Sequence, residues 1–304
     1  MLEHHYPRRS FLQGIAGSGV LAAGLAPAEP LSSVSLGQKR VSRLIAGSNP
    51  ISGYSYGPSK LTRHMLSYFT VERTTEFLLH CEQQGITTFQ GFFSPTIRGA
   101  LLAARERGSK LQFILLASGF EQGIPKEALE LDPIAICHHG GVTDTLFRSG
   151  KREAVHDFVK RIRDAGFVAG ISMHNPDNLA RIEDSGWEND FYMTCFYHLT
   201  RTPEELAKMM PEPTVELALH EYIFFAGDPE RMTRRIREVK KPCLAFKILG
   251  AGRCCKNAQT LESAFAFAFQ NIKASDGVIV GMYPALSDEA KEDAELVRKL
   301  GRLV

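Results

Sequence analysis

The sequence of 304 residues lacks the features that mark several classes of protein. It has no block of basic residues, and its formal net charge is only +2, so nothing in its charge indicates a nucleic-acid partner. After residue 28 it has no apolar run long enough for a stable membrane anchor. It also lacks the Cys-x-x-Cys, His-Glu-x-x-His and His-x-His spacings of common zinc sites. We therefore expect a globular chain whose partner is a small-molecule substrate, and the oligomeric state stays open.

Residues 1–28 have the layout of an export signal rather than of folded structure. The pair Arg8-Arg9 stands before a short apolar stretch rich in Gly and Ala, which ends at the small residues Ala26-Pro27-Ala28. This order is typical of a twin-arginine signal peptide. We predict cleavage after Ala28 and a periplasmic or otherwise exported protein. The twin-arginine route generally carries folded chains, often with a cofactor, so it mildly favours a bound metal or cofactor.

Six cysteines in an exported chain raise the question of disulfides. Cys254 and Cys255 are adjacent and stand in a predicted loop. The other four lie within apolar helix or strand patterns, where a free thiol behaves as a small apolar side chain. We therefore predict buried thiols at Cys81, Cys137, Cys195 and Cys243.

Eight apolar, strand-like runs alternate with helical patterns along the rest of the chain. Strands buried on both faces read as continuous apolar runs, and strict alternation of strand and helix implies a parallel sheet. Eight such units predict an α/β fold, a (β/α)8 TIM barrel, with a doubly wound open sheet as the alternative. The predicted strands span 43–49, 86–92, 111–118, 134–139, 168–175, 191–198, 243–250 and 277–283.

We expect the barrel to occupy residues 41–304 as one domain, after a linker over 29–40. The segment 200–239 is longer than one crossover helix requires, so we predict a lid-like insertion there, over the barrel mouth. The predicted helices span 70–84, 96–107, 125–131, 151–165, 176–185, 203–210, 229–239, 260–272 and 288–300.

Histidines follow three successive predicted strands. His138 and His139 end the fourth run, His174 ends the fifth and His198 ends the sixth. Since the carboxyl ends of barrel strands carry the chemistry, these side chains are candidates for one site. Three neutral imidazoles, His138, His174 and His198, could bind Zn²⁺ or Mn²⁺. Alternatively His138 is a general acid or base while the others bind substrate, and a single core imidazole remains the plain structural explanation.

Lys247 stands inside an apolar run, where a lysine is costly unless it is paired or used. A lowered pKa would suit a Schiff base or a general base. We place an ion-paired or anion-binding lysine ahead of that role. The remaining candidates are Gln90 and Asp144 as catalytic groups beside His138 and Lys247, and Asn49, His139, Tyr197, Phe246 and Arg253 as substrate-binding groups.

The order of these segments resembles the aldo/keto reductase superfamily. The run GITTFQGF is similar to that family's GINTFDTA, and LDPIAICHHGG, GFVAGIS and NPDNL are similar to its stretch from strand four through strand five. FYMTCFYHLTR, CLAFKILGAG and DGVIVGM resemble its last three strands. The resemblance covers most of the chain after residue 40. It implies a (β/α)8 barrel and, for typical members, an NAD(P)-dependent reduction of a carbonyl.

The catalytic tetrad of that family is degenerate in this sequence. Gln90 stands at the Asp position, Pro95 near the Tyr position and Ser118 near the Lys position, and only His138 matches. The tyrosine that protonates the carbonyl is therefore missing.

The residues that the resemblance assigns to the nicotinamide are mixed. Ser172 fits the family, whereas Met173 and Thr194 replace an Asn and a Gln, and Phe246 could replace the stacking aromatic ring. Fold alone does not imply function. We therefore favour a non-redox lyase, isomerase or hydrolase acting on a small polar, sugar-derived carbonyl or hydroxyl substrate. An atypical NAD(P)-dependent oxidoreductase is the alternative, and a non-catalytic binding protein is the third hypothesis.

Overall fold

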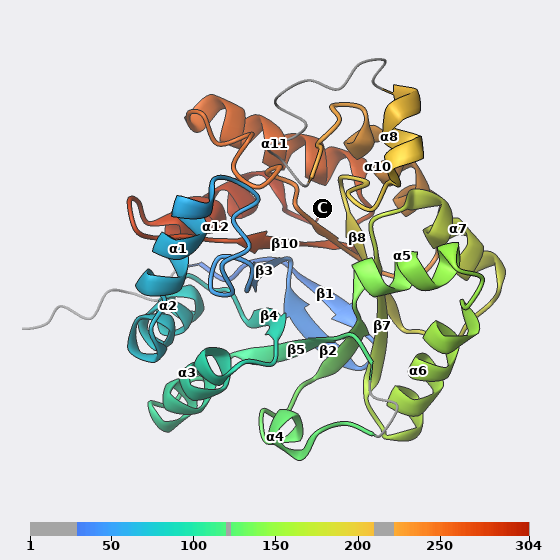
Figure 1. Cartoon of the computed structure of the whole chain (residues 1–304). Helices are drawn as coiled ribbons and strands as arrows, with labels where there is room; N and C mark the ends of the chain where they lie inside the picture. Colours follow the sequence, from blue (N-terminus) through green and yellow to red (C-terminus); the bar gives the residue numbers. More distant parts are fainter. Residues whose placement is uncertain (1–28, 120–122, 210–221, 304) are drawn as a thin grey trace, which may run out of the picture.

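The computed structural model describes residues 29–119, 123–209 and 222–303, and its centre is a closed barrel of eight parallel strands (Figure 1). Each strand pairs with the next one along the chain, and the last pairs with the first. The predicted (β/α)8 barrel is therefore confirmed, and the open sheet is wrong. The strands are β3 (Leu44–Gly47), β4 (Thr88–Phe92), β5 (Gln112–Ala117), β6 (Ala135–His138), β7 (Val168–Met173), β8 (Phe191–Cys195), β9 (Cys243–Phe246) and β10 (Gly277–Gly281).

Helices surround this barrel on its outside (Figure 1). Each predicted helical segment overlaps a helix, and the described residues include two further helices that the sequence did not predict, α1 and α5. α5 begins with two glycines, which are poor helix formers, so its start does not read as a helix. The helices are α1 (Ser59–Tyr68), α2 (Val71–Gln83), α3 (Pro95–Glu106), α4 (Lys126–Leu129), α5 (Gly140–Arg148), α6 (Glu153–Asp164), α7 (Pro176–Asp184), α8 (Pro203–Met209), α10 (Asp228–Glu238), α11 (Ala258–Asn271) and α12 (Glu289–Leu300).

α6 shows why these segments form helices on the barrel wall. Its apolar residues recur at the spacing of one helical face, and its charged residues occupy the other face. The buried face consists of Val155, Phe158, Val159 and Ile162, which belong to the main apolar core. The helix thereby covers the outside of β6 and β7, with which it is in contact.

Two sets of buried side chains distinguish the wall of the barrel from its interior. Alternate strand residues such as Ile136 and Ala169 pack with the surrounding helices. The residues between them, such as Cys137 in β6, pack with one another inside the barrel, as period-two alternation requires. The interior set is Ile45, Ile114, Leu116, Ala135, Cys137, Phe191, Met193, Leu244 and Ile279.

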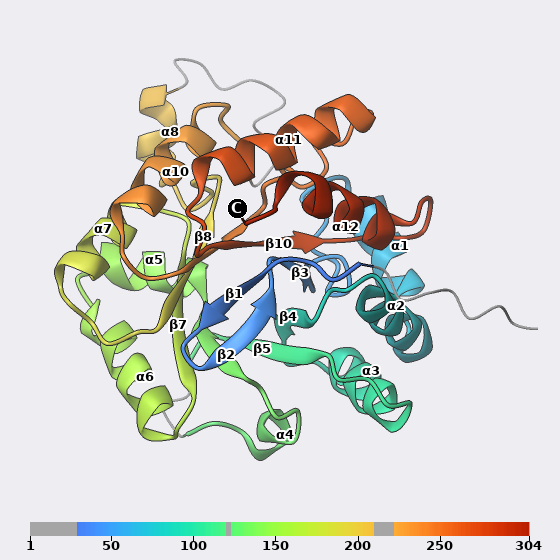
Figure 2. The same ribbon diagram turned by 180° about the vertical axis from the view of Figure 1, so that it is seen from behind.

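A β-hairpin closes the amino-terminal end of the barrel, where it crosses in front of the strands in Figure 2. It consists of β1 (Ser33–Leu36) and β2 (Lys39–Ser42), paired antiparallel. Val34, Leu36 and Val41 are buried against the interior set. The prediction of a linker over 29–40 is therefore wrong for most of that range, because alternate apolar residues give the segment one face to bury.

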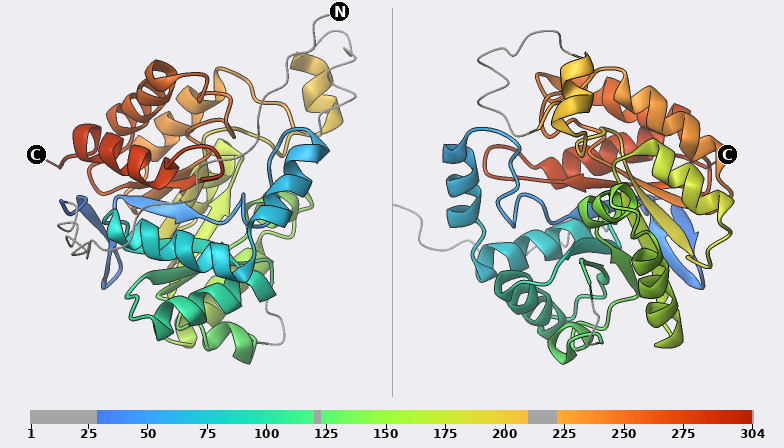
Figure 3. Two further views of the ribbon diagram at one scale, coloured as in Figure 1. Left: turned by 90° about the vertical axis from the view of Figure 1, so that its left-hand side faces the viewer. Right: turned by 45° about the vertical axis from the view of Figure 1, so that its right-hand side comes forward.

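The predicted insertion over 200–239 also needs a new boundary. α10 packs against α7 and α11 as the barrel's own helix between β8 and β9, so the insertion ends before it. α8 lies at the periphery, beyond the ring of barrel helices (Figure 3). The rest of the predicted lid, 210–221, lies outside the described residues, as does the signal peptide predicted over 1–28. Within the described part of the chain, no helix combines the length and apolar character that crossing a membrane requires.

All six cysteines lie within the described residues and are free thiols. Cys254 is half-buried and Cys255 is exposed, in the loop after β9. The four that we predicted to be buried are buried, so that prediction is confirmed: Cys81, Cys137, Cys195 and Cys243.

Candidate active site

The two adjacent histidines at the end of β6 point to opposite sides of the barrel wall. The ring of His138 meets the ring of Phe158 in α6 at 4.9 Å between centroids, and its Nδ1 lies 2.7 Å from Oγ1 of Thr143 in α5. The ring of His139 instead lies 5.4 Å from that of Phe92, at the end of β4. This geometry does not favour the predicted role of His138 as a catalytic group or metal ligand. His138 is a hydrogen-bonded wall residue, and His139 takes its place at the mouth.

The glycine pair after these histidines makes room for two imidazoles. A Cβ on Gly140 would lie 2.8 Å from Oγ of Ser172 and 3.0 Å from Cε1 of His174. A Cβ on Gly141 would lie 3.2 Å from Cε1 of His139. His139 and His174, from neighbouring strands, therefore both lie against the first turn of α5, and only glycine allows them that close.

Both of these imidazoles are neutral at neutral pH. Burial lowers the pKa of His139 to about 4, and the nearby His174 and Lys247 lower it further against the opposite effect of Asp144. Burial also lowers the pKa of His174, against the raising effect of Asp144. The positive end of the α5 dipole disfavours a charged imidazole in the same direction. Neutral imidazoles can accept a proton or donate a hydrogen bond, as proton-transfer chemistry requires.

Lys247 brings a positive charge to the same mouth. It directly follows β9, adopts a left-handed backbone conformation with φ of 59°, and its Nζ lies 4.6 Å from the ring centroid of Tyr56 and 4.7 Å from that of Phe246. Burial acts to lower the pKa of Lys247, but Cys195 and Tyr56 outweigh it, and the pKa lies above its ordinary value. A raised pKa does not favour the Schiff-base alternative, which needs a lowered one. It keeps Lys247 as an ammonium group, which suits anion binding, and that role stays a prediction.

Aromatic rings form a rim around this end of the barrel. The guanidinium of Arg253 lies 3.9 Å over the ring of Phe224 and donates hydrogen bonds to the backbone oxygens of Gly250 and Tyr56, both at 3.1 Å. The ring of Tyr197 lies 4.9 Å from that of Phe224. Arg253 and Tyr197, both predicted to bind substrate, therefore belong to the rim. Arg253 also ties the loop after β9 to the loop after β3.

Two predicted residues lie at this end of the barrel without a recorded link to the cluster. Asn49 follows β3, and Gln90 is a buried residue of β4 that pairs in register with Gly47. Among the described residues, no hydrogen bond, ion pair or ring contact joins either side chain to His139 or Lys247. Their predicted roles in catalysis and binding stay predictions.

Asp144 does not present its carboxylate to the mouth, which does not favour its predicted role as a catalytic acid or base. The residue is 2% exposed. Its carboxylate accepts hydrogen bonds from the backbone N–H of His174 at 2.8 Å, from Nδ2 of Asn178 at 2.8 Å and from Oγ1 of Thr200 at 2.9 Å. These bonds connect α5 with the end of β7, the start of α7 and the segment after β8.

The three histidines predicted to bind a metal do not share one site. His138 faces the helices and His174 faces the mouth. The buried Nε2 of His198 has no hydrogen-bond partner among the described residues. Over residues 29–119, 123–209 and 222–303, no three His, Cys, Asp or Glu side chains are arranged to hold a metal ion. The predicted Zn²⁺ or Mn²⁺ site at this trio is therefore wrong.

The sequence analysis missed four residues that shape the mouth. Phe92 and Tyr56 contribute rings, and Gly140 and Gly141 make room for the imidazoles. The motif His-His-Gly-Gly could have predicted part of this arrangement. Adjacent strand residues point to opposite sides, so only one of the two histidines can face the mouth, and glycines permit a close approach of other side chains. Nothing in the sequence around Tyr56 announces its contact with Lys247, because that contact joins loops almost 200 residues apart.

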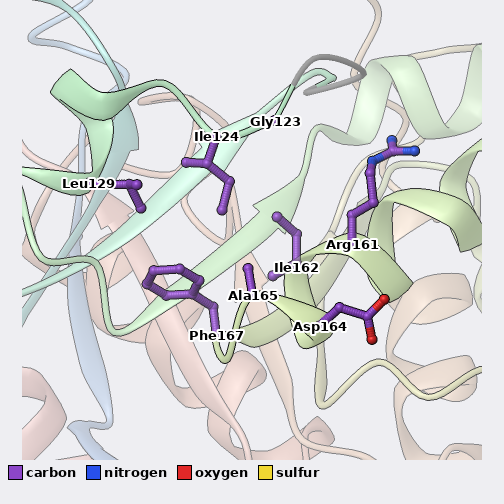
Figure 4. Close-up of a pocket in the computed structure, with 8 residues that line it drawn as sticks. All are labelled: Gly123, Ile124, Leu129, Arg161, Ile162, Asp164, Ala165 and Phe167. Atoms are coloured by element: carbon purple, nitrogen blue, oxygen red, sulfur yellow. The ribbon is translucent and has the colours of Figure 1, made fainter.

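One cavity lies elsewhere, on the side of the barrel. It has a volume of about 600 Å³ and lies between the α4 region and the carboxyl end of α6. Figure 4 shows Ile124, Leu129 and Phe167 around it, with the Arg161 side chain directed away from its centre. Phe167 directly precedes β7, so this cavity lies towards the amino ends of the strands, and its lining holds no imidazole or thiol. We therefore assign the chemistry to the mouth.

Comparisons with known proteins find structures with a similar fold but with low sequence identity to this chain. No protein-family model matches the chain, and no curated protein matches it. The crystal structure of apo Gox0644 matches with a TM-score of 0.53 at 11% identity, over 91% of this chain and 97% of that one. A Gox0644 mutant in complex with NADPH matches with a TM-score of 0.52 at 11% identity, over 91% of this chain and 90% of that one.

The holo form of the aldo-keto reductase AKR11C1 from Bacillus halodurans is also similar, with a TM-score of 0.45 at 14% identity, over 89% of this chain and 96% of that one. At such identities a likeness concerns the fold and not the reaction. The chain has a closed (β/α)8 barrel, the fold that its sequence predicted.

Proposed function

We propose that this protein is a non-redox enzyme that transfers protons on a small, anionic, sugar-derived hydroxy-carbonyl substrate, as an isomerase or a lyase. One observation carries the proposal: two neutral imidazoles, His139 and His174, share the barrel mouth with the ammonium group of Lys247. Perturbed titrating groups of this kind gather at functional sites. The carboxyl end of the strands is also where barrel enzymes hold their reacting groups.

The chemistry follows from these charges. One neutral imidazole removes a proton from the carbon beside the substrate carbonyl, and the electron pair moves onto the carbonyl oxygen. The other imidazole and the ammonium of Lys247 stabilise that negative oxygen. To give an isomer, the imidazole returns the proton to the former carbonyl carbon while the proton of the adjacent hydroxyl moves to the carbonyl oxygen. To give a lyase product, the imidazole instead passes its proton to a hydroxyl group that leaves the next carbon as water.

Deuterium exchange tests this proposal without knowledge of the product. The purified protein is incubated in D₂O with a panel of ketoses, uronates and hydroxy-acid sugars, and loss of the proton beside the carbonyl is followed by NMR. We expect exchange with at least one anionic member and none with the matched neutral sugar. At a substrate concentration below KM, Lys247→Met should exchange about 10- to 100-fold more slowly, whereas Lys256→Met, in the same loop, should retain the wild-type rate. Absence of exchange across the panel would contradict the proposal.

The NAD(P)-dependent alternative is favoured by the position of Phe246. Its half-buried ring lies at the end of β9, 5.5 Å from the ring of His174, where a planar nicotinamide could stack. The match to a structure that contains NADPH is in keeping with this, but concerns the fold only. Titration with NADPH, followed by its fluorescence, distinguishes the two functions. Saturable binding that Phe246→Ala abolishes, together with absence of deuterium exchange, would favour the oxidoreductase.

We also propose that the chain is exported through the twin-arginine route. The support is the pair Arg8-Arg9 ahead of a weakly apolar segment that ends at Ala28. The double variant Arg8→Lys with Arg9→Lys should remain in the cytoplasm as the uncleaved chain. Normal recovery of the cleaved double variant outside the cytoplasm would contradict the assignment.

A further inference from the structure

We infer that Asp144 is a positioning residue that holds a proton on Nδ1 of His174, so that the unprotonated Nε2 faces the mouth as the base. The tautomer follows from contacts of this chain, and the role as base rests on the proposed function. His139 is then the imidazole that polarises the carbonyl oxygen together with Lys247.

Hydrogen bonds other than any to the His174 imidazole hold the carboxylate of Asp144 in place. Its buried oxygens accept from Asn178, Thr200 and the backbone N–H of His174, at 2.8–2.9 Å. These donors come from three different segments, so the carboxylate cannot turn away without breaking several bonds. Hydrogen bonds and the His174 imidazole hold the pKa of Asp144 below its ordinary value, even though burial acts to raise it. Asp144 is therefore a fixed negative charge.

The imidazole of His174 meets this charge with its Nδ1 edge. Nδ1 lies 3.3 Å from Oδ2 of Asp144, at an angle too oblique for an ideal hydrogen bond, and has no other polar partner in the described chain. An unprotonated Nδ1 would place its negative lone pair beside a carboxylate oxygen, which is repulsive in a buried site. A protonated Nδ1 directs a partial positive charge there instead. The contact therefore selects the Nδ1–H tautomer.

The opposite edge of the same ring is left for the substrate. No described residue donates to or accepts from Nε2 of His174, and the ring meets Phe246 edge-on at 5.5 Å, beside Lys247. When Nε2 takes a proton, the carboxylate of Asp144 stabilises the imidazolium that forms, as in other Asp–His pairs. His139 has no carboxylate contact of this kind, and it lies against the positive end of α5, which suits a neutral hydrogen-bond donor.

Nitrogen NMR of the imidazoles tests the tautomer directly. The whole protein is labelled with ¹⁵N at histidine, and two-bond proton–nitrogen spectra are recorded at pH 7, with His174→Gln used to assign the signals. We expect a protonated Nδ1 and an unprotonated Nε2 at His174 in the wild type. In Asp144→Asn the proton should redistribute, so that the Nε2–H tautomer becomes populated.

The matched controls remove other partners of the same carboxylate. Thr200→Val and Asn178→Ala each delete one donor to Asp144 but keep the charge beside Nδ1, so the tautomer of His174 should not change. An Nε2–H tautomer in the wild type would overturn the inference, even if Asp144→Asn fails to fold. So would a folded Asp144→Asn variant with the wild-type tautomer. Neither measurement involves turnover, so failure of the proposed function is recognised separately, by absence of deuterium exchange.

Discussion

His138 and His139 are neighbours in the chain, yet they belong to two different regions of the molecule. Burial lowers the pKa of both to about 4. His138, in the barrel wall, satisfies Nδ1 with Thr143 and packs on Phe158. His139, at the mouth, makes no hydrogen bond through its ring among the described residues and lies near another imidazole and an ammonium group. The comparison teaches that a perturbed pKa does not by itself identify a functional site. The neighbouring side chains, here a second imidazole and an ammonium group, are what distinguish His139 from His138.

The largest expected effect separates the two histidines by activity. For a substrate that exchanges deuterium, His139→Gln should reduce the exchange rate about 10²- to 10⁴-fold, because a group that assists proton transfer is lost. His138→Gln should retain the rate, since that side chain faces α5 and α6. If both variants fold and lose the exchange rate equally, the distinction between a wall histidine and a mouth histidine is contradicted.

The charge at the mouth should matter next. Lys247→Met removes an ammonium group that hydrogen-bonds an anion, an interaction worth about 1.5–3 kcal/mol. We therefore expect KM for an anionic substrate to rise about 10- to 100-fold. The KM values of the wild type, of Lys247→Met and of the control Lys256→Met check this, and an unchanged KM in Lys247→Met would contradict the assigned role.

The glycine pair predicts a stability effect at the mouth. Gly140→Ala places a Cβ against Ser172 and His174, and such overpacking costs about 1–3 kcal/mol. Gly227→Ala is the matched control, because a Cβ there meets nothing within 4 Å and the glycine is not left-handed. Urea unfolding gives both free energies of unfolding. A Gly140→Ala variant as stable as the control would contradict the close packing.

The wall histidine predicts a smaller effect, visible in the pH dependence of stability. The pKa of His138 is about 4 in the folded state against an ordinary 6.5, so between these values only the unfolded chain binds the proton. Its contribution is fully present above about pH 6.5 and is lost as the pH falls towards 4. One proton corresponds to at most about 1.4 kcal/mol per pH unit. Urea unfolding of His138→Gln over this range should show a shallower pH slope, and an unchanged slope would contradict the burial of a neutral imidazole.

The fold was predictable because each strand carries its own apolar run. Each of the eight strands could be recognised from its own residues, without knowing which strands it pairs with. The alternation of these strands with amphipathic helices then indicated a parallel sheet closed into a barrel. The hairpin was missed because only four buried positions, such as Val34 and Leu36, distinguish it from a linker. α5 was missed because its first turn is built from glycines.

The site was predictable only in part, because strand phase decides which side chain enters it. His139, His174, Phe246 and Lys247 were all candidates, and they do gather. The choice of His138 over its neighbour required the register of β6, which a one-residue shift reverses. The role of Asp144 rests on contacts with segments 30 to 56 residues away, and no local pattern announces these.

Acylation of the two neighbouring imidazoles by diethyl pyrocarbonate tests the central claim most directly. The reagent attacks an accessible, unprotonated ring nitrogen, and tandem mass spectrometry of the peptide 127–148 resolves the two positions. His139 is partly exposed and neutral at the mouth, whereas His138 is 2% exposed with Nδ1 engaged. We predict rapid acylation of His139 in the folded protein and acylation of His138 only after unfolding. Acylation of His138 as fast as, or faster than, that of His139 in the native protein would contradict the account.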